Sequence, residues 1–231
     1  MPKGSSDAFR GTAEPRLPRA LAPLAQPTVE DETEWNGVEV RGEMDVLDEV
    51  GYLEVSSSRL EQLRLTGRRF GKLRLVDVVL EDCDLSACTL EDASLIRVEF
   101  RRCRLSWLEG AGLRAEDVGL TDSKLDGANL RMSKWERASL EDCDLRGTDL
   151  YAVHLRSARL VRCNLAGAQF AKADMSGAAL HGSNLEGIQG GESLRGVVIG
   201  SDQVMPLSTA VFGALNIAVD DDDPAAGSGR A

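Results

Sequence analysis

The side chains best suited to chemistry in this sequence are two histidines and five cysteines. His154 and His181 could act as acid–base groups or metal ligands, and the thiols could form a metal or redox site. The sequence contains no phosphate-binding G-x-x-x-x-G-K-[ST] loop, no H-E-x-x-H zinc motif and no G-x-S-x-G nucleophile turn. What the histidines and cysteines can do therefore depends on the elements that position them.

Large apolar residues recur at every fifth position from Leu60 to Leu185. They occupy 24 of these 26 positions, and the exceptions are Gly110 and Ala115. Two residues before each position, a small side chain (Ser, Ala, Cys, Thr or Val) stands in 21 of the 26 cases. A period of five fits neither a helix nor a flat strand. It fits a chain that turns a corner after every five residues and keeps the large residue inside.

A longer repeat of twenty residues is superimposed on the period of five. The string Glu-Asp-Cys-Asp-Leu ends at Leu85 and again at Leu145, and four of the cysteines are separated by multiples of twenty. We therefore expect coils of four sides and twenty residues. Each coil can bury its apolar set only because the next coil covers it.

Units such as Gly-Ala-Asn-Leu-Arg at 127–131, together with 172–175 and 182–186, form a tandem array of the A(D/N)LXX type. This array resembles the pentapeptide-repeat family over more than half of the chain. The resemblance implies an all-β fold, a right-handed quadrilateral β-helix in which the central Leu or Phe and the small residue two before it both point inward.

This arrangement leaves the candidate chemical groups without a shared site. His154 and His181 each stand next to a core Leu, so they point outward on different sides of the rod and cannot converge on a metal. The cysteines lie in the small inward column, where we expect them to pack as small hydrophobic residues. We predict no enzyme and no catalytic, cofactor or metal site. The predicted structural core includes Leu85, Leu105, Leu125, Leu145, Leu165, Cys83, Cys103, Cys143 and Cys163.

The segments outside the repeat differ in composition. Residues 1–34 hold five of the seven prolines and an acidic run, which predicts a disordered arm, and residues 220–231 predict a disordered acidic tail. Residues 35–57 are expected to form an N-terminal cap or irregular first coils, and residues 58–200 the β-helix. Helical spacing of apolar residues predicts a C-terminal capping helix within 201–219.

The lapse at Gly110 and Ala115 has two interpretations. Leu108 and Leu113 stand in the small column there, so large and small residues could have exchanged places with the total volume conserved. Alternatively, residues 108–112 could protrude as a loop, and loops often carry binding sites.

The chain of 231 residues carries a net charge of -11. An acidic chain is a poor general binder of nucleic acids or anionic membranes, but it could mimic DNA. The charge is -6 over residues 1–59, -1 over 60–187 and -4 over 188–231. The acidity therefore belongs to the ends, and the repeat rod is nearly neutral.

Two groups of outward residues are candidates for binding a partner. The first lies on the most acidic face, where Arg101, Arg102 and Arg162 interrupt the acids, so a self-compensating surface is the alternative. The second is apolar, and its members could equally be scattered surface residues. The candidates are Glu81, Asp82, Asp122, Glu141 and Asp142 in the first group, and Trp107, Met132 and Tyr151 in the second.

Cysteine usage and the lack of leader-like or membrane-spanning stretches indicate a compartment. An odd number of cysteines without a C-x-x-C pair is typical of a reduced protein. No apolar stretch has the length of a signal peptide or a transmembrane helix. We expect a cytoplasmic protein that contacts neither membrane nor nucleic acid directly.

The expected function is a non-catalytic protein–protein interaction module built on a rigid rod. The alternative comes from the resemblance: some bacterial pentapeptide-repeat proteins mimic DNA, bind DNA gyrase or topoisomerase IV, and give resistance to quinolones or to self-made toxins. Such proteins often dimerise through a C-terminal helical segment, which Val204–Leu215 resembles, so a homodimer is expected with that function. A weaker third possibility is an enzyme subunit or toxin-immunity partner without chemistry of its own.

Overall fold

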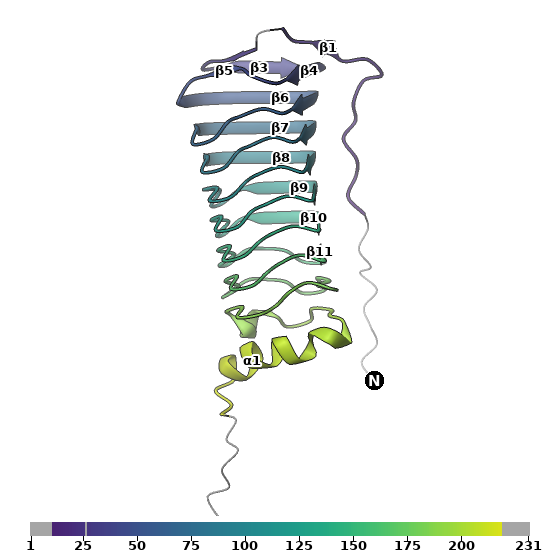
Figure 1. Cartoon of the computed structure of the whole chain (residues 1–231), viewed down its shortest axis with the longest axis vertical. Coiled ribbons are helices and arrows are strands. Elements are labelled where there is room, and N and C mark those ends of the chain that lie inside the picture. Colours follow the sequence, from purple (N-terminus) through teal and green to yellow (C-terminus); the bar gives the residue numbers. More distant parts are fainter. Residues whose placement is uncertain (1–10, 26, 219–231) are drawn as a thin grey trace, which may run out of the picture.

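The computed structural model describes residues 11–25 and 27–218, and stacked coils dominate it (Figure 1). A nine-stranded parallel sheet runs in the order β1-β4-β6-β7-β8-β9-β10-β11, with β3 also paired to β6, and β2 pairs with β5 separately. The fold is a right-handed quadrilateral β-helix with a helix at its C-terminal end, as expected. The strands are β1 (Ala22–Pro23), β2 (Thr28–Val29), β3 (Thr33–Asn36), β4 (Val38–Arg41), β5 (Asp45–Val46), β6 (Glu49–Glu61), β7 (Arg69–Glu81), β8 (Thr89–Arg101), β9 (Arg114–Thr121), β10 (Lys134–Glu141) and β11 (Arg159–Val161).

The register between successive coils is twenty residues. Leu60 pairs with Leu80, and Leu80 pairs with Phe100. Outside the strands the same step continues, because the amide of Leu65 donates to the carbonyl of Asp84 at 2.7 Å. Each coil is therefore hydrogen-bonded to the next, and neighbouring coils lie about 4.8 Å apart along the rod.

Most corners are made by the residue two positions after a central apolar residue; Lys72 and Asp92, which lie within the long strands β7 and β8, are exceptions. Asp82 and Asp142 adopt left-handed backbone conformations, with φ of 54° and 55°, and Gly127 does the same with φ of 67°. A left-handed residue reverses the local twist and lets the chain turn within one residue. This turn explains why the repeat has five residues.

The core is a continuous column of inward side chains. All nine residues predicted as structural core are at most 5% exposed. The small column fits beside the corners, and the large central residues of adjacent coils stack on one another. Burying one Leu or Phe in this way contributes about 1.5–3 kcal/mol.

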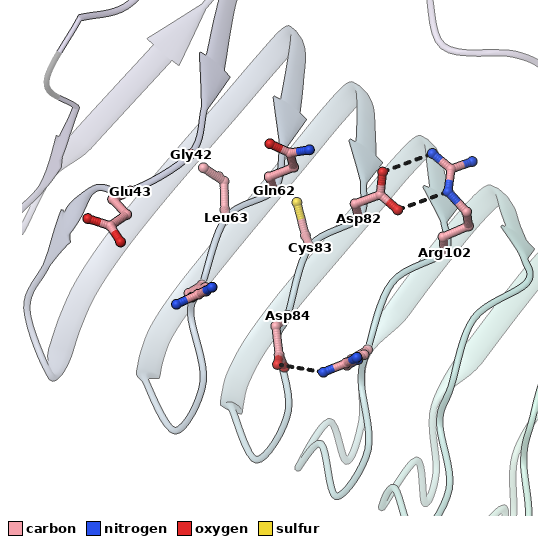
Figure 2. Close-up of a pocket in the computed structure, with 10 residues that line it drawn as sticks. Gly42, Glu43, Gln62, Leu63, Asp82, Cys83, Asp84 and Arg102 are labelled. Carbon is pink, nitrogen blue, oxygen red and sulfur yellow. Dashed lines mark hydrogen bonds and ion pairs between the residues drawn. The ribbon is translucent and has the colours of Figure 1, made fainter.

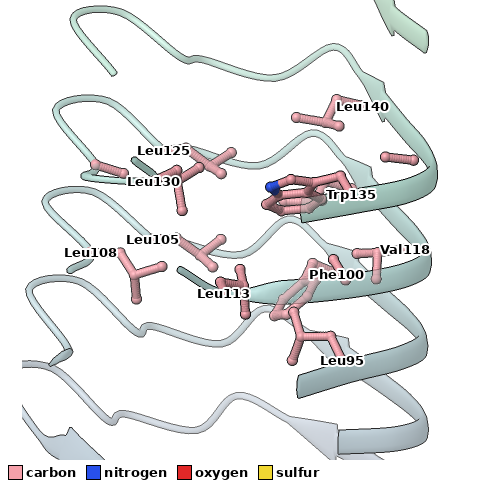
Figure 3. Packing of buried hydrophobic residues seen from close by; sticks show 14 of the residues in the cluster. Leu95, Phe100, Leu105, Leu108, Leu113, Val118, Leu125, Leu130, Trp135 and Leu140 are labelled. Atoms are coloured by element: carbon pink, nitrogen blue, oxygen red, sulfur yellow. The ribbon is translucent and has the colours of Figure 1, made fainter. Parts of the chain in front are cut away.

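Where the repeat lapses at Gly110 and Ala115, the large and small side chains have exchanged positions. Leu108 and Leu113 are buried, and Gly110 remains in the coil because its amide donates to the carbonyl of Asn129 at 2.8 Å. A Cβ on Gly110 would lie 3.3 Å from Leu130 and 3.5 Å from Leu108, so these two side chains fill the space that glycine leaves. Figure 3 shows Leu108, Leu113 and Leu130 pointing into the same interior. Residues 108–112 do not form a loop.

The first coils differ from expectation. Trp35 pairs with Val55 and Val40 with Leu60, so the twenty-residue register already holds within 35–57. The predicted disorder of 1–34 is wrong for residues 11–25 and 27–34, which include β1 and β2; residues 1–10 lie outside the described residues. The composition of this segment predicts disorder because the segment cannot bury an apolar core of its own. In the structure, the surface of the rod provides the contacts that order it.

Residues 11–20, which we call the N-terminal strap, run beside the coils. Figure 1 shows this purple segment passing back along the rod from the first coils. Two backbone amides of the strap donate to carboxylates of the rod, from Ala13 to Asp117 and from Arg16 to Asp77.

The C-terminal end of the rod is closed by Gln203. Its Nε2 donates to the carbonyls of Leu180 and Ser183 at 2.7 and 2.6 Å, and its Oε1 accepts from the amide of Gly200. Gln203 stands twenty residues after Ser183, so its side chain replaces the backbone of a further coil. The short 3-10 turns η1 (Gly191–Ser193) and η2 (Ser201–Gln203) lead into α1 (Val204–Ala214).

The predicted acidic tail at 220–231 lies outside the described residues. Among residues 11–25 and 27–218, no helix is both long enough and apolar enough to cross a membrane.

Candidate interaction surface

One corner of the rod, which we call the open corner, carries Asp82, Arg102, Asp122, Asp142 and Arg162 in successive coils. Arg102 donates to both carboxylate oxygens of Asp82 at 2.8 and 2.9 Å, and Arg162 donates to both of Asp142 at 2.8 and 2.7 Å. These hydrogen bonds lower the pKa of both aspartates below the usual range. The acids that the sequence singled out are therefore neutralised by the coil that follows.

The other predicted acids follow the same pattern, with one exception. Glu81 forms an ion pair with Arg102, and Glu141 forms one with Arg162. Within the part of the chain that the structure describes, Asp122 makes no ion pair. The side chains of Asp82 and Asp142 are 42% and 40% exposed, so solvent screens each pair and its contribution to stability is small.

A shallow depression of about 490 Å³ adjoins the start of this corner (Figure 2). Its polar lining is of mixed sign, and Cys83 lies at its base but is buried. No group of three potential metal ligands occurs among residues 11–25 and 27–218. The depression can make charge contacts with a partner surface. Its polar lining residues are Glu43, Gln62, Arg64, Asp82, Asp84, Arg102 and Arg104.

The two histidines do not converge, whereas four of the cysteines lie side by side in adjacent coils as Cys83 with Cys103 and Cys143 with Cys163. His154 lies in the column of Lys134 and Asp174, whereas His181 extends that of Glu141 and Val161, and both are exposed. The cysteines are buried, and burial raises the pKa of Cys88 to about 11. A thiol with such a pKa is protonated at neutral pH and is a poor nucleophile.

The apolar candidates fall into two separate places. Trp107 is 66% exposed and lies against Gly127 of the next coil, where an added Cβ would come within 2.6 Å of the ring. Met132, 56% exposed, occupies a different corner and donates its amide to the carbonyl of Tyr151 at 2.8 Å. The structure therefore brings Met132 and Tyr151 together, and Trp107 does not join them.

Tyr151 lies between two cations. The guanidinium of Arg131 is 4.3 Å from the ring centroid, and the ammonium of Lys172 is 5.2 Å from it. Contacts of this kind contribute about 0.5–1 kcal/mol at exposed sites. Tyr151 and Met132 thus form a small patch, which we call the Tyr151 patch; Lys172 lies on one side of the ring, and Arg131, which is also ion-paired with Asp149, lies on the other.

A second charged corner, which the sequence interpretation missed, carries Asp77, Arg97, Asp117 and Arg137; we call it the covered corner. Arg97 donates to both carboxylate oxygens of Asp77 at 2.6 and 2.7 Å, and Arg137 to both of Asp117 at 2.7 and 3.0 Å. The strap adds a third donor to each aspartate: Arg16 N lies 2.9 Å from Asp77 Oδ1, and Ala13 N 3.0 Å from Asp117 Oδ1.

The strap changes the environment of the covered corner. The side chains of Asp77 and Asp117 are 11% and 9% exposed, against about two fifths for their counterparts on the open corner. The hydrogen bond from Arg97 lowers the pKa of Asp77. Burial alone would raise the pKa of Asp117, but hydrogen bonds from Arg137 and the Ala13 amide hold it below the usual value.

The sequence contains a signal for this corner. Asp and Arg alternate in steps of twenty at 77, 97, 117 and 137, and Pro15 and Pro18 lie three residues apart. Only the structure links the two patterns, because nothing in the strap's composition identifies the acceptor of its amides.

Comparison with protein-family models assigns the repeats. The model described as pentapeptide repeats matches residues 74–107, 123–153 and 148–187, with eight copies. The repeats in these residues are pentapeptide repeats. The matched copies lie within the stacked coils, between β7 and the last coil before η1.

Solved structures similar to this chain include a variant of QnrB1, described as a plasmid-mediated fluoroquinolone resistance protein. It is 18% identical, with a TM-score of 0.43, over 87% of this chain and 98% of that one. Another is HetL from the cyanobacterium Nostoc sp. strain PCC 7120, described as involved in heterocyst differentiation regulation, at 22% identity and a TM-score of 0.32, over 74% and 84% of the two chains. Likenesses of this strength say nothing about what the chain binds.

No curated protein sequence matches the chain. The surface of this chain is therefore the part of the molecule that indicates its function. That surface offers two corners of ordered ion pairs, the Tyr151 patch, and exposed apolar residues on α1.

Proposed function

We propose that this chain is a non-catalytic protein–protein interaction module, a rigid rod that docks a protein partner. The observation that carries the proposal is the Tyr151 patch. Met132 is exposed beside a tyrosine that two cations hold in place. Tyr, Met and Arg are enriched at protein interfaces, where a few well-ordered side chains supply most of the binding free energy.

The rod supports this role through its rigidity. Met132 and Tyr151 project from coils joined by backbone hydrogen bonds, including the 2.8 Å contact between these two residues. Side chains that are already ordered lose little conformational entropy when a partner binds. A flat, regular wall can therefore bind a folded partner without rearranging.

Site-specific photo-crosslinking tests the proposal. A photoreactive residue at position 132 of the full chain in its native host should give a discrete adduct, whereas the same residue at exposed His181 should not. With the identified partner purified, we expect Tyr151→Ala to weaken binding by about tenfold or more, and His181→Ala to leave the dissociation constant unchanged.

Two results would contradict the proposal. Equal dissociation constants for Tyr151→Ala, His181→Ala and the unaltered chain would remove the Tyr151 patch as the docking surface. Reproducible turnover in an unbiased substrate screen, lost when an outward carboxylate is changed, would make the chain an enzyme.

The C-terminal end supports homodimerisation as part of this function. Met205 and Leu215 on or next to α1 are exposed, and Phe212 is partly so. Contiguous exposed apolar residues commonly mark an interface. Sedimentation equilibrium should give a dimer for the full chain and a monomer for Met205→Glu/Leu215→Glu. A monomer in both cases would exclude this contact.

The alternative, a DNA-mimicking binder of DNA gyrase or topoisomerase IV, has weaker support. Four of the five predicted acids are paired with arginines, so the open corner lacks a continuous negative stripe. Asp122 is the acid that favours the idea. A gyrase supercoiling assay with and without a quinolone decides it: no inhibition and no protection at large molar excess would remove the alternative.

A further inference from the structure

The strap and the covered corner share a common spacing. Arg16 stands three positions after Ala13. The aspartate that accepts from Ala13, Asp117, lies two coils after Asp77, which accepts from Arg16. Three residues of polyproline II helix span about 9.3 Å. Two coils at the usual distance between strands span about 9.6 Å. A polyproline II chain laid along the rod therefore presents one amide to every second coil, which is where the aspartates stand.

The composition of the strap fits this conformation. Pro15 directly precedes Arg16, and Pro18 follows it by two residues. The proline ring fixes φ and so stiffens the chain, and because proline has no backbone N–H it adds no unsatisfied donor. The side chains of Ala13 and Arg16 are exposed although their amides bind the rod, while Thr12 and Pro15 are half-buried. The covered corner thus recognises backbone amides and an extended shape, and it leaves the side chains at 13 and 16 free to vary.

The coils under the strap do not depend on it for their own hydrogen bonds. β7, β8, β9 and β10 pair with one another over residues 69–141. The open corner carries the same paired aspartates and arginines, and there, in the part of the chain that the structure describes, Asp82 and Asp142 stay 42% and 40% exposed without a strap. The strap is therefore an added ligand on a preformed surface, held by two hydrogen bonds to charged acceptors.

We propose that the covered corner is a binding site for extended, proline-rich protein segments, and that the strap occupies it as an internal ligand which a proline-rich segment of the partner displaces. The proposal rests on the proposed function and names the chemistry of its partner. Because the strap is tethered, its effective concentration is in the millimolar range, and it competes strongly with segments supplied in trans. Release of the strap would therefore control access to the site.

The first test frees the site in the full-length chain. Ala13→Pro/Arg16→Pro removes both amide donors and keeps the strap extended, because proline favours polyproline II. The matched control is Glu14→Pro, which stiffens the same segment and keeps both donors. The probe is a fluorescent peptide with the sequence of residues 11–24, followed by anisotropy. We expect the peptide to bind the double variant at least about tenfold more tightly than it binds the unaltered chain or the control.

The second test locates the binding. In the Ala13→Pro/Arg16→Pro chain, Asp77→Asn/Asp117→Asn should weaken peptide binding several-fold, because each charge-assisted hydrogen bond becomes a neutral one. Asp82→Asn/Asp142→Asn on the open corner should leave it unchanged. Asn tolerates the left-handed backbone at these corners, so the substitutions spare the fold.

Defined results overturn the proposal. A peptide that carries proline at positions 13 and 16 should not bind; if it binds as well as the natural sequence, the amides are not what is recognised. Absence of saturable binding to the freed chain up to about 1 mM peptide also excludes the site. If the double variant fails to fold, hydrogen exchange of the unaltered chain replaces it: excess peptide should speed exchange across residues 11–20, and no change there rejects displacement.

These assays use the purified chain and no partner, so their failure leaves the proposed interaction function standing. Conversely, loss of the partner adduct at position 132 would not affect peptide binding at the covered corner.

Discussion

The backbone amide of Arg16 donates a 2.9 Å hydrogen bond to Oδ1 of Asp77, although 61 residues separate the two in the sequence. The same carboxylate accepts two hydrogen bonds from Arg97, the residue one coil further along. Asp77 therefore joins three parts of the chain: its own coil, the next coil and the strap. This one carboxylate helps to hold the strap, together with Asp117, and also orders the corner beneath it.

Acid should release the strap. The pKa values of Asp77 and Asp117 are lowered in the folded state, so both carboxylates stabilise it above their unfolded pKa of about 3.9. That contribution is lost as the pH falls from this value through the folded pKa. We expect the thermal midpoint of the unaltered chain to fall more steeply below about pH 4 than that of Asp77→Asn/Asp117→Asn. Parallel curves for the two proteins would contradict the prediction.

Gln203 should stabilise the end of the rod. Gln203→Ala removes a buried donor from the Ser183 carbonyl and one of the two donors of the Leu180 carbonyl, which still accepts from the Ser183 amide. We expect the free energy of unfolding to fall by about 1–3 kcal/mol, measured by urea denaturation. Thr209→Ala, on the exposed side of α1, is the matched control and should stay within about 0.5 kcal/mol of the unaltered chain. A similar loss for both variants would mean that α1 and not the amide closes the rod.

The exchange of sizes at Leu108 and Gly110 should appear as coupling in a double-mutant cycle. Leu108→Ala should cost about 2–5 kcal/mol through the cavity that it leaves, and Gly110→Leu about 1–3 kcal/mol or more through overpacking. The double variant restores the ordinary repeat, so we expect its loss of stability to be smaller than the sum by at least about 1 kcal/mol. Additive losses in urea denaturation would show that the two positions do not share one space.

The two charged corners should respond differently to loss of an arginine. Arg102→Gln leaves an exposed Asp82 that water can solvate, so the free energy of unfolding should change little. Arg137→Gln leaves Asp117, which is 9% exposed, with less compensation, and should cost more. Equal losses for the two variants in the same denaturant titration would mean that the strap does not alter the environment of the covered corner.

Much of the fold could be predicted because large apolar residues recur in the sequence at a fixed interval of five positions. Every fifth residue from Leu60 onwards identifies the interior, and the recurrence of Glu-Asp-Cys-Asp-Leu at Leu85 and Leu145 gives the length of a coil. The register at Trp35 was missed because the early coils contain fewer of the marker residues, although the backbone pairing is regular.

The candidate site was harder to predict, for physical reasons. Whether Leu108 protrudes could not be decided, since an exchange of sizes and a loop use the same residues. The pairing of Asp82 with Arg102 was anticipated as charge compensation, because a step of twenty places them side by side. The contact of Ala13 with Asp117 has no such step, and a backbone amide leaves no trace in residue type.

The strap and the stacked coils repeat at different intervals along the rod. The two intervals match because three residues of the strap span about the same length as two coils. Inserting forty residues between Asp77 and Asp117 would preserve this coincidence for a strap lengthened by three residues. Inserting twenty would set an arginine where an acceptor is needed. The alternation of Asp and Arg at the covered corner therefore restricts the insertions that the rod can accept. Coils can be added in pairs, whereas an odd number of added coils would leave the strap without one of its acceptors.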